Sequence, residues 1–249
     1  NSTFEEAKYM LISCSAFVNY LKENASRVKG YIISHAHDDQ MGALPYIYRK
    51  VPAPIYCSSI TAELIKNKTI LYGLKPIDYD FHIVSSGSTI IDGREFIFFK
   101  MTHSVPGNLS VAIDTSDGYI VYTSDFIIDF GASELNRMDF TLLTSLPLKK
   151  KILLLITESC DAEKSGHASP NHRITQHIQR LFSEAKGRIF ISIYSQNLFN
   201  LQEVIDLGIK TNKKIIFLNN EVNELFSEKI ISQLFTIPQA NKATKNDLN

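Results

Sequence analysis

The first third of the chain alternates amphipathic stretches with short apolar runs. The spacing predicts a helix, a strand, a helix, a strand and a helix, at residues 16–24, 31–34, 42–51, 55–57 and 61–73. Thr61 is the predicted N-cap of the last helix, and Gly73 is the residue predicted to end it. The first strand therefore runs straight into the polar segment 34–40.

The middle of the chain has the pattern of a sheet. Across residues 81–126, short β-branched and aromatic runs alternate with the turn dipeptides Asp92-Gly93 and Asp117-Gly118. The second dipeptide lies inside a hairpin pattern, so we expect antiparallel strands. After a polar stretch, residues 151–157 form a continuous apolar run, which predicts a strand buried on both faces.

From Ser169 onward the pattern changes to alternating helix and strand. Ser169 and Pro170 predict an N-cap followed by Pro at the first helical position. The elements that we expect are a helix, a strand, a helix, a strand and a helix, at residues 169–187, 188–194, 200–209, 214–219 and 222–235. Two such βα units in series predict a parallel sheet packed by helices. The tail at 239–249 has no apolar period, which predicts disorder.

Composition restricts the class of protein. The chain has 249 residues, 44% of them hydrophobic, and 26 basic against 26 acidic residues. This balance excludes disordered, collagenous and coiled-coil chains, and it means that a nucleic-acid partner needs a local basic groove. No apolar run has membrane-spanning length, and the sequence start does not have the pattern of a signal peptide.

The number and spacing of the cysteines indicate the cellular compartment in which the protein is expected. Cys14, Cys57 and Cys160 are far apart and never in a CxxC spacing. A disulfide framework and a structural zinc knot are therefore both disfavoured, and a reducing cytoplasmic setting fits best.

The residues with candidate chemistry begin in segment 34–40. His35, His37 and Asp39 alternate where a strand meets a loop, and from a tight loop such side chains can converge on a metal ion. His103 and Asp125 each follow the end of a later apolar run, where side chains gather at one edge of a sheet. Five such positions at strand ends predict a metal site.

Four segments together resemble a known family. They are SHAHDDQMGALPYI, MTHSVPGNLSVAIDTSDGYIVYTSDF, ITESCDAEKSGHASPNHR and GRIFISIYSQNLFNLQEVIDLGIKTNKKI. The first is similar to the HxHxDH signature of the metallo-β-lactamase fold, and the set is most similar to the ribonuclease J group of the β-CASP branch, whose members cut RNA. The resemblance implies an α/β fold, with part of a metallo-β-lactamase αββα sandwich at residues 1–165 and the start of a parallel βαβα β-CASP domain at 166–249.

The same resemblance implies a metal-ligand set. His35, His37 and His103 would hold one zinc ion, Asp39 would serve a second zinc ion, and Asp125 would bridge the two. Zinc is the expected cofactor, with manganese or magnesium as alternatives. In a two-metal site the ions activate water and stabilise the departing oxygen.

The resemblance also implies two catalytic carboxylates. Asp39 could orient or deprotonate the nucleophile, and Glu158 matches the acidic residue that opens the β-CASP motif series. Asp38 is expected to act from outside the ligand set.

Gln40 departs from the family pattern. It stands where the signature ends in His, and an amide oxygen is a much weaker zinc ligand than an imidazole nitrogen. We therefore expect the second metal to be held loosely or to be absent. The family's early Asp-Ala-Gly-type motif and its late His motifs are not found in this chain, so we expect the sequence to be a piece of a longer one that cannot complete the site alone.

The expected substrate is RNA, held in a cleft between the two domains. Ser195 and Asn197 lie between a predicted strand and helix, where backbone N–H groups often hold phosphate, and Arg188 is one of several basic residues nearby. The expected function is metal-dependent 5′-exo- or endonucleolytic decay and processing of RNA. A weakly active or non-catalytic partner subunit of a ribonuclease complex is the alternative suggested by Gln40. A small-molecule metallo-hydrolase is disfavoured by the βα units after residue 169. We expect a homo- or hetero-oligomer with a related subunit and no membrane association.

Overall fold

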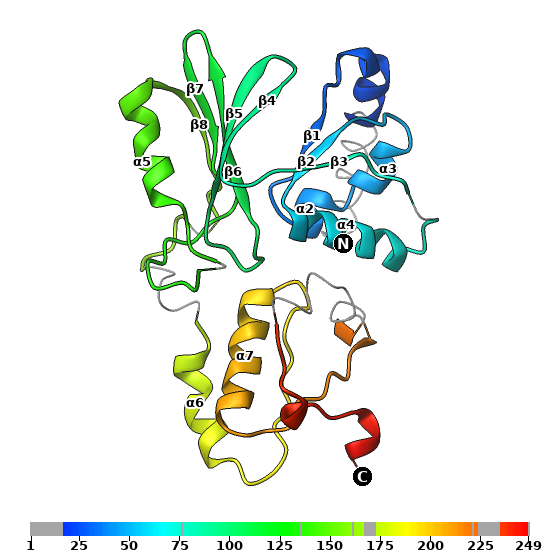
Figure 1. The fold of residues 1–249 in the computed structure, drawn as a ribbon, viewed down its shortest axis with the longest axis vertical. Coiled ribbons are helices and arrows are strands. Elements are labelled where there is room, and N and C mark those ends of the chain that lie inside the picture. Colours follow the sequence, from blue (N-terminus) through cyan, green and yellow to red (C-terminus); the bar gives the residue numbers. More distant parts are fainter. Residues whose placement is uncertain are drawn as a thin grey trace.

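A computed structural model of the chain describes residues 17–75, 77–134, 136–160, 162–166, 173–220, 222–223 and 235–248. Its upper part, in the view of Figure 1, holds two sheets that face each other. The first is a parallel sheet of β1 (Tyr31–Ile32), β2 (Ile55–Cys57) and β3 (Phe81–Ile83), in that order. Residues 17–23 are helical, as predicted, and the short 3₁₀ helix η1 (Ala25–Arg27) leads from them toward β1.

The second sheet has five strands in sequential order. They are β4 (Gly87–Ile91), β5 (Arg94–Lys100), β6 (Leu109–Thr115), β7 (Gly118–Tyr122) and β8 (Ile152–Ile156). All neighbours are antiparallel except β7 and β8, which are parallel. Both predicted turn dipeptides join antiparallel neighbours, and Asp92 and Gly118 have positive φ there. The hairpin prediction is confirmed.

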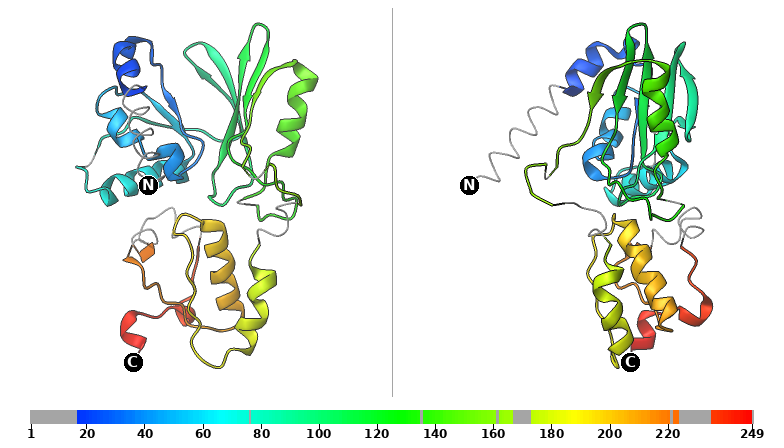
Figure 2. Two further views of the ribbon diagram at one scale, coloured as in Figure 1. Left: turned by 180° about the vertical axis from the view of Figure 1, so that it is seen from behind. Right: turned by 90° about the vertical axis from the view of Figure 1, so that its left-hand side faces the viewer.

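Helices cover the outer face of each sheet (Figures 1 and 2). On the first sheet they are α2 (Asp38–Met41), α3 (Leu44–Tyr48) and α4 (Ser59–Leu71), and on the second α5 (Phe140–Lys149). Each interface has its own apolar cluster: Ile55 packs under α4, Phe98 between the two sheets, and Phe99 under α5. Phe98 and Phe99 point to opposite faces because side chains alternate along a strand. The layers therefore run α, β, β, α, and the mixed α/β prediction is confirmed.

Three local predictions need correction in this part. The N-cap of α4 is Ser58, not Thr61, since the Ser58 hydroxyl accepts the Thr61 N–H at 3.2 Å and Thr61 lies inside the helix. Strand β8 is not buried on both faces, because its five side chains are 38% to 56% exposed at the end of the sheet order. Helix α5 was not predicted, although Asp139 caps it by accepting the Leu142 N–H. Gly73, with φ of 67°, ends α4 as predicted.

The remaining part of the structure contains α6 (Thr175–Glu184) and α7 (Leu198–Lys210), followed by the 3₁₀ helices η2 (Gln239–Asn241) and η3 (Lys245–Leu248). Helices α6 and α7 pack against each other. Leu198 and Leu201 of α7 belong to the same apolar cluster as Ile33 and Val105 of the upper part. The start of α7 is therefore packed against the loops that follow β1 and β5.

The predicted parallel sheet is not found in this part of the described chain. Residues 188–194 and 214–219 are not strands, because no described strand lies beside them to complete a hydrogen-bond ladder. Ile215 makes only an isolated bridge to Lys242. The predicted tail, 239–249, carries η2 and η3, which corrects the expectation of disorder for its described part. The predicted cap at Ser169 and most of the helix at 222–235 lie outside the described residues. No helix in the described ranges is long and apolar enough to cross a membrane.

Candidate metal centre

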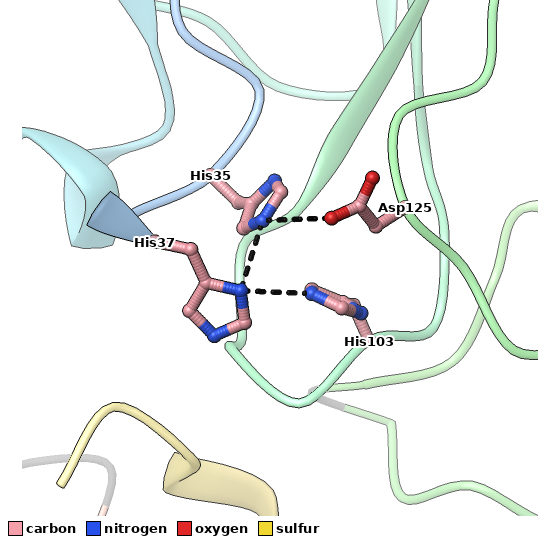
Figure 3. Close-up of side chains that lie close together, drawn as sticks. All are labelled: His35, His37, His103 and Asp125. Atoms are coloured by element: carbon pink, nitrogen blue, oxygen red, sulfur yellow. Dashed lines mark hydrogen bonds and ion pairs between the residues drawn. The ribbon is translucent and has the colours of Figure 1, made fainter. Parts of the chain in front are cut away.

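Four of the predicted ligands meet where strands of both sheets end. His35 follows β1, His37 occupies the N-cap position of α2, His103 follows β5, and Asp125 follows β7. One ligand atom of each lies within 4.8 Å of the others (Figure 3). The expectation that His103 and Asp125 gather at one edge of a sheet is confirmed, and His35 and His37 reach the same point from the other sheet.

Main-chain hydrogen bonds hold the three loops together. Leu109 N–H donates to the carbonyl of Ser34 at 3.0 Å, which ties the loop after β1 to β6. Ile127 N–H donates to the carbonyl of Thr102 at 2.8 Å, which ties the loop after β7 to the loop after β5. These two main-chain hydrogen bonds fix the positions of the loops that carry the candidate ligands, so the ligand side chains converge.

The distances within the cluster match a small tetrahedral metal ion. His37 Nδ1 lies 3.2 Å from His35 Nε2 and 3.2 Å from His103 Nε2, and Asp125 Oδ2 lies 3.7 Å from His35 Nε2. Ligands about 2.05 Å from a central ion, at tetrahedral angles, are separated by about 3.3 Å. The three rings also meet edge to face, at 73° to 79° with centroids 4.6 to 4.8 Å apart, so that their nitrogens and not their faces point inward.

The hydrogen bonds behind His35 fix its tautomer. The Asn108 amide group donates to the carbonyl of Asp125 at 2.7 Å, so Asn108 Oδ1 faces Ser124 and accepts the Ser124 hydroxyl proton at 2.9 Å. Ser124 Oγ is then left to accept from His35 Nδ1, 3.2 Å away, and Ser34 Oγ, which faces Gln40 Oε1 at 3.5 Å, is a second acceptor 3.0 Å from the same nitrogen. His35 therefore carries its proton on Nδ1 and presents the lone pair of Nε2 to the cluster, which is the form that binds a metal.

Burial keeps the imidazoles neutral. Burial, and then the neighbouring His103 and His37, lower the pKa of His35 to about 2, and burial followed by His37 lowers the pKa of His103 to about 4. Burial also lowers the pKa of His37. Neutral imidazole is the form that coordinates a metal, so protons compete weakly for these sites.

Acidic groups surround the same point. The pKa of Asp125 is raised, first by burial and then by the negative charges of Asp39 and Glu158. A divalent cation among these carboxylates would remove the repulsion that raises this pKa. The residues present therefore fit a metal ion, both in donor type and in charge.

Asp39 and Glu158 are near this cluster but outside the set whose ligand atoms lie within 4.8 Å of one another among the described residues. Glu158 Oε2 accepts the Cys160 N–H at 2.7 Å, so its carboxylate is held by its own turn. Asp39 Oδ2 accepts from Gln40 Nε2 at 3.0 Å. The assignment of these two carboxylates to catalysis stays a prediction.

Gln40 is already engaged on both sides of its amide. Its Oε1 accepts from the Tyr122 hydroxyl at 3.2 Å and lies 3.5 Å from Ser34 Oγ, and its Nε2 donates to Asp39. A histidine at this position could offer a nitrogen lone pair to a second ion. Gln40 instead connects Asp39 to the hydroxyl groups of β7 and of the loop after β1.

The residues expected to contact RNA lie between α6 and α7. Asn197 is the N-cap of α7, with its Oδ1 accepting the Asn200 N–H at 3.0 Å. Phe199 N–H donates to the carbonyl of Ser104 at 2.8 Å, and Leu198 N–H to that of Gln196 at 3.0 Å. The first N–H groups of α7 are therefore used within the protein, and any RNA contact of Ser195, Asn197 or the exposed Arg188 depends on side chains; it stays a prediction.

Some groups in the site were missed by the sequence analysis. Asn108, Ser124 and Ser104 orient the candidate ligands, Ser104 through a contact of 3.2 Å to His37 Nε2. Ser104 and Ser124 are direct sequence neighbours of His103 and Asp125. That adjacency was the available signal, whereas nothing local marks Asn108.

Two curated proteins are similar in sequence to this chain. Ribonuclease J 2 of Staphylococcus saprophyticus is 32% identical over 212 residues, covering 84% of this chain, and Ribonuclease J 2 of Staphylococcus aureus is 30% identical over 224 residues, covering 89%. The chain is therefore similar in sequence to both proteins over most of its own length. It spans 38% and 40% of the lengths of these two relatives. No protein-family model matches the chain.

Solved structures give the fold. A protein of unknown function from Enterococcus faecalis matches with a TM-score of 0.59 and 17% identity, over 88% of this chain and 55% of its own. A metallo-β-lactamase from Pontibacter korlensis matches over 57% of this chain and 67% of its own, with a TM-score of 0.39 and 18% identity.

Proposed function

We propose that the protein is a metal-dependent ribonuclease that hydrolyses phosphodiester bonds of RNA, as a 5′-exonuclease, an endonuclease or both. The observation that carries this proposal is the convergence of His35, His37, His103 and Asp125 to within 4.8 Å, in a chain similar in sequence to ribonuclease J 2. Zinc is the proposed metal because three imidazole nitrogens and one carboxylate oxygen are its usual donors.

Each residue of the candidate site has a proposed role. A bound divalent ion would supply water activation and neutralise charge on a phosphate. His35, His37, His103 and Asp125 would hold that ion, with the His35 tautomer set in advance by Ser124. Asp39 is the proposed acceptor of the proton from the attacking water, held in place by the Gln40 amide. Glu158 lies close enough to raise the pKa of Asp125 and is the proposed second carboxylate.

A second candidate function follows from Gln40. Because both ends of its amide are engaged by Tyr122 and Asp39, the protein would bind one metal where an HxHxDH site binds two. Such a protein would turn over RNA slowly, or would serve as the non-catalytic partner of an active subunit in a cytoplasmic ribonuclease assembly. We place residues 1–165 in its metallo-β-lactamase domain and residues 166–249 in a β-CASP domain, with RNA between them.

The deciding experiment measures decay of a 5′-monophosphorylated RNA together with bound metal per chain, in the full-length protein. We expect slow decay and one tightly bound zinc in wild type. In Gln40→His we expect a second equivalent and faster decay, since an imidazole replaces the engaged amide.

His103→Ala is the matched control, because it removes a candidate ligand of the first metal. We expect it to lose both zinc and activity. RNA decay that is the same in wild type and His103→Ala would refute the ribonuclease proposal. Unchanged metal content and turnover in Gln40→His would refute our account of Gln40.

A further inference from the structure

Tyr194 lies beside the candidate metal centre without being part of it. Its ring is 60% exposed and its centroid is 6.3 Å from that of His37. It belongs to the segment between α6 and α7. In the same segment, the backbone of Gln196 forms a hydrogen bond with the His37 ring. A large aromatic face is therefore presented to solvent next to a candidate ligand.

A chain of hydrogen bonds holds this ring in place. The Tyr194 hydroxyl donates to Gln196 Oε1 at 2.6 Å, and Gln196 Nε2 donates to Asp38 Oδ1 at 3.1 Å. Asp38 Oδ1 also accepts from the Tyr72 hydroxyl at 3.1 Å and lies 3.2 Å from Lys68 Nζ. Asp38 is thus a junction between α2, α4 and the segment of Tyr194, and the ring is oriented before any ligand arrives.

The surface around Tyr194 is formed by aromatic ring faces more than by unpaired charged groups. Tyr72 stacks on Tyr46 at 29° and 6.3 Å, and Tyr46 is 51% exposed. Lys68 lies over the Tyr72 ring at 5.4 Å and is paired with Asp38. Because the nearby cation is engaged by a carboxylate, this surface suits a planar uncharged group better than a phosphate.

We propose that Tyr194 is a stacking platform for one unpaired nucleobase of an RNA whose phosphate lies at the metal centre, and that Gln196 and Asp38 are its positioning residues. This inference rests on the proposed function. Unpaired bases are commonly bound by stacking on aromatic side chains, and such stacking needs little sequence preference. A base and its phosphate are joined by a single sugar, so a ring beside His37 is within reach of the nucleotide held at the metal.

The test is equilibrium binding in the zinc-loaded full-length protein, measured by the fluorescence anisotropy of a 3′-labelled single-stranded RNA with hydrolysis-resistant phosphorothioate linkages, so that the metal stays bound and the RNA stays intact. We expect Tyr194→Ala to weaken binding by about 5- to 150-fold, the loss of one stacked base. Tyr194→Phe keeps the ring and should keep most of the affinity, and Gln196→Ala should lie between the two. Tyr20→Ala is the matched control, because Tyr20 is 57% exposed on the helix at 17–23 and should not change binding.

An abasic scan of the RNA identifies the stacked base. In wild type, one abasic position should cost about the same factor as Tyr194→Ala, and in Tyr194→Ala that position should cost nothing more. Binding of Tyr194→Ala within twofold of wild type, or abasic losses that persist in it, would overturn the inference.

The two proposals fail in different ways. A wild-type protein that binds RNA through Tyr194 but never hydrolyses it with zinc or manganese supports the platform and refutes the ribonuclease. A protein that hydrolyses RNA, and whose Tyr194→Ala variant binds and turns over as wild type does, supports the ribonuclease and refutes the platform.

Discussion

Replacing Asn108 by alanine should lower both the stability of the protein and its affinity for metal, although Asn108 is not a candidate ligand. The side chain is 1% exposed and donates to the carbonyls of Asp125 and Met101 at 2.7 and 3.4 Å, while accepting from Ser124 at 2.9 Å. Each buried group left without a partner costs about 1–3 kcal/mol, so three groups set an upper range of about 3–9 kcal/mol. Water entering the vacated space recovers part of this, and we expect a loss of about 3 kcal/mol in the free energy of unfolding.

The same variant should lose metal affinity. Without Asn108 the Ser124 hydroxyl can donate to His35 Nδ1, which competes with the proton on that nitrogen and leaves Ser34 Oγ, 3.0 Å away, as its acceptor. Groups that orient metal ligands contribute about 10- to 100-fold to metal affinity, and we expect a loss in this range. Since domains are stable by about 5–15 kcal/mol, the variant remains folded for the measurement.

The assay is zinc competition against a chromophoric chelator, with urea unfolding of the metal-free protein in parallel. Asn136→Ala is the control: Asn136 is also buried, at 5% exposure, but it donates to Ser133 away from the candidate ligands. It should keep its zinc affinity. Equal zinc affinity in Asn108→Ala and wild type would refute the reasoning about the His35 tautomer.

Two further predictions concern stability. Burial lowers the folded-state pKa of His103 to about 4, so below pH 6.5 the unfolded chain takes up a proton that the folded protein does not, and stability falls as the pH drops from 6.5 to 4. The His103 contribution should amount to roughly 2–3 kcal/mol in urea titrations of the metal-free protein, and His103→Asn should reduce the pH-dependent loss by about that amount, while the loss from His35, whose pKa is lowered to about 2, persists; equally steep profiles in wild type and His103→Asn would contradict it. Arg173 Nη2 lies 2.7 Å from Oδ2 of the buried Asp129, whose Oδ1 also accepts the Gly131 N–H at 2.9 Å. Arg173→Ala removes the cation from this buried carboxylate and should cost about 3 kcal/mol by the same measurement, whereas Arg180→Ala, at an exposed pair, should cost under about 1 kcal/mol. Equal costs for the two arginines would contradict the assignment of a buried ion pair.

The candidate ligands could be found from the sequence because each lies directly after an apolar run. The edge of a sheet is a local consequence of where strands end, so His103 and Asp125 could be placed near each other without coordinates, whereas His35 follows a strand of the other sheet and was grouped with them through the family resemblance. The hydrogen-bond partners of Gln40 could not be found from the sequence. Tyr122 is 82 positions away, and its hydroxyl reaches Gln40 only because of the register of β7.

Errors in the fold have a similar cause. The apolar run in β8 has the composition of a buried strand, but burial depends on what lies on either side, and β8 is the last strand of its sheet. Residues 188–194 have strand composition too, yet a strand needs a neighbour to pair with. Helix α5 was hidden because Pro147 lies inside it, which reads locally as a stop.

Ser124 restricts which residues can stand between β7 and Asp125. Its φ of 58° is in the left-handed region, and its hydroxyl must both give a proton to Asn108 and take one from His35. Glycine would adopt the backbone without providing the oxygen, and threonine would provide the oxygen at a steric cost in the backbone. Aspartate tolerates the geometry, but it would add another negative charge beside Asp125. Zinc affinities measured for a set of substitutions at this one position would therefore separate two requirements of metal binding, the left-handed backbone conformation and the hydrogen bond to His35.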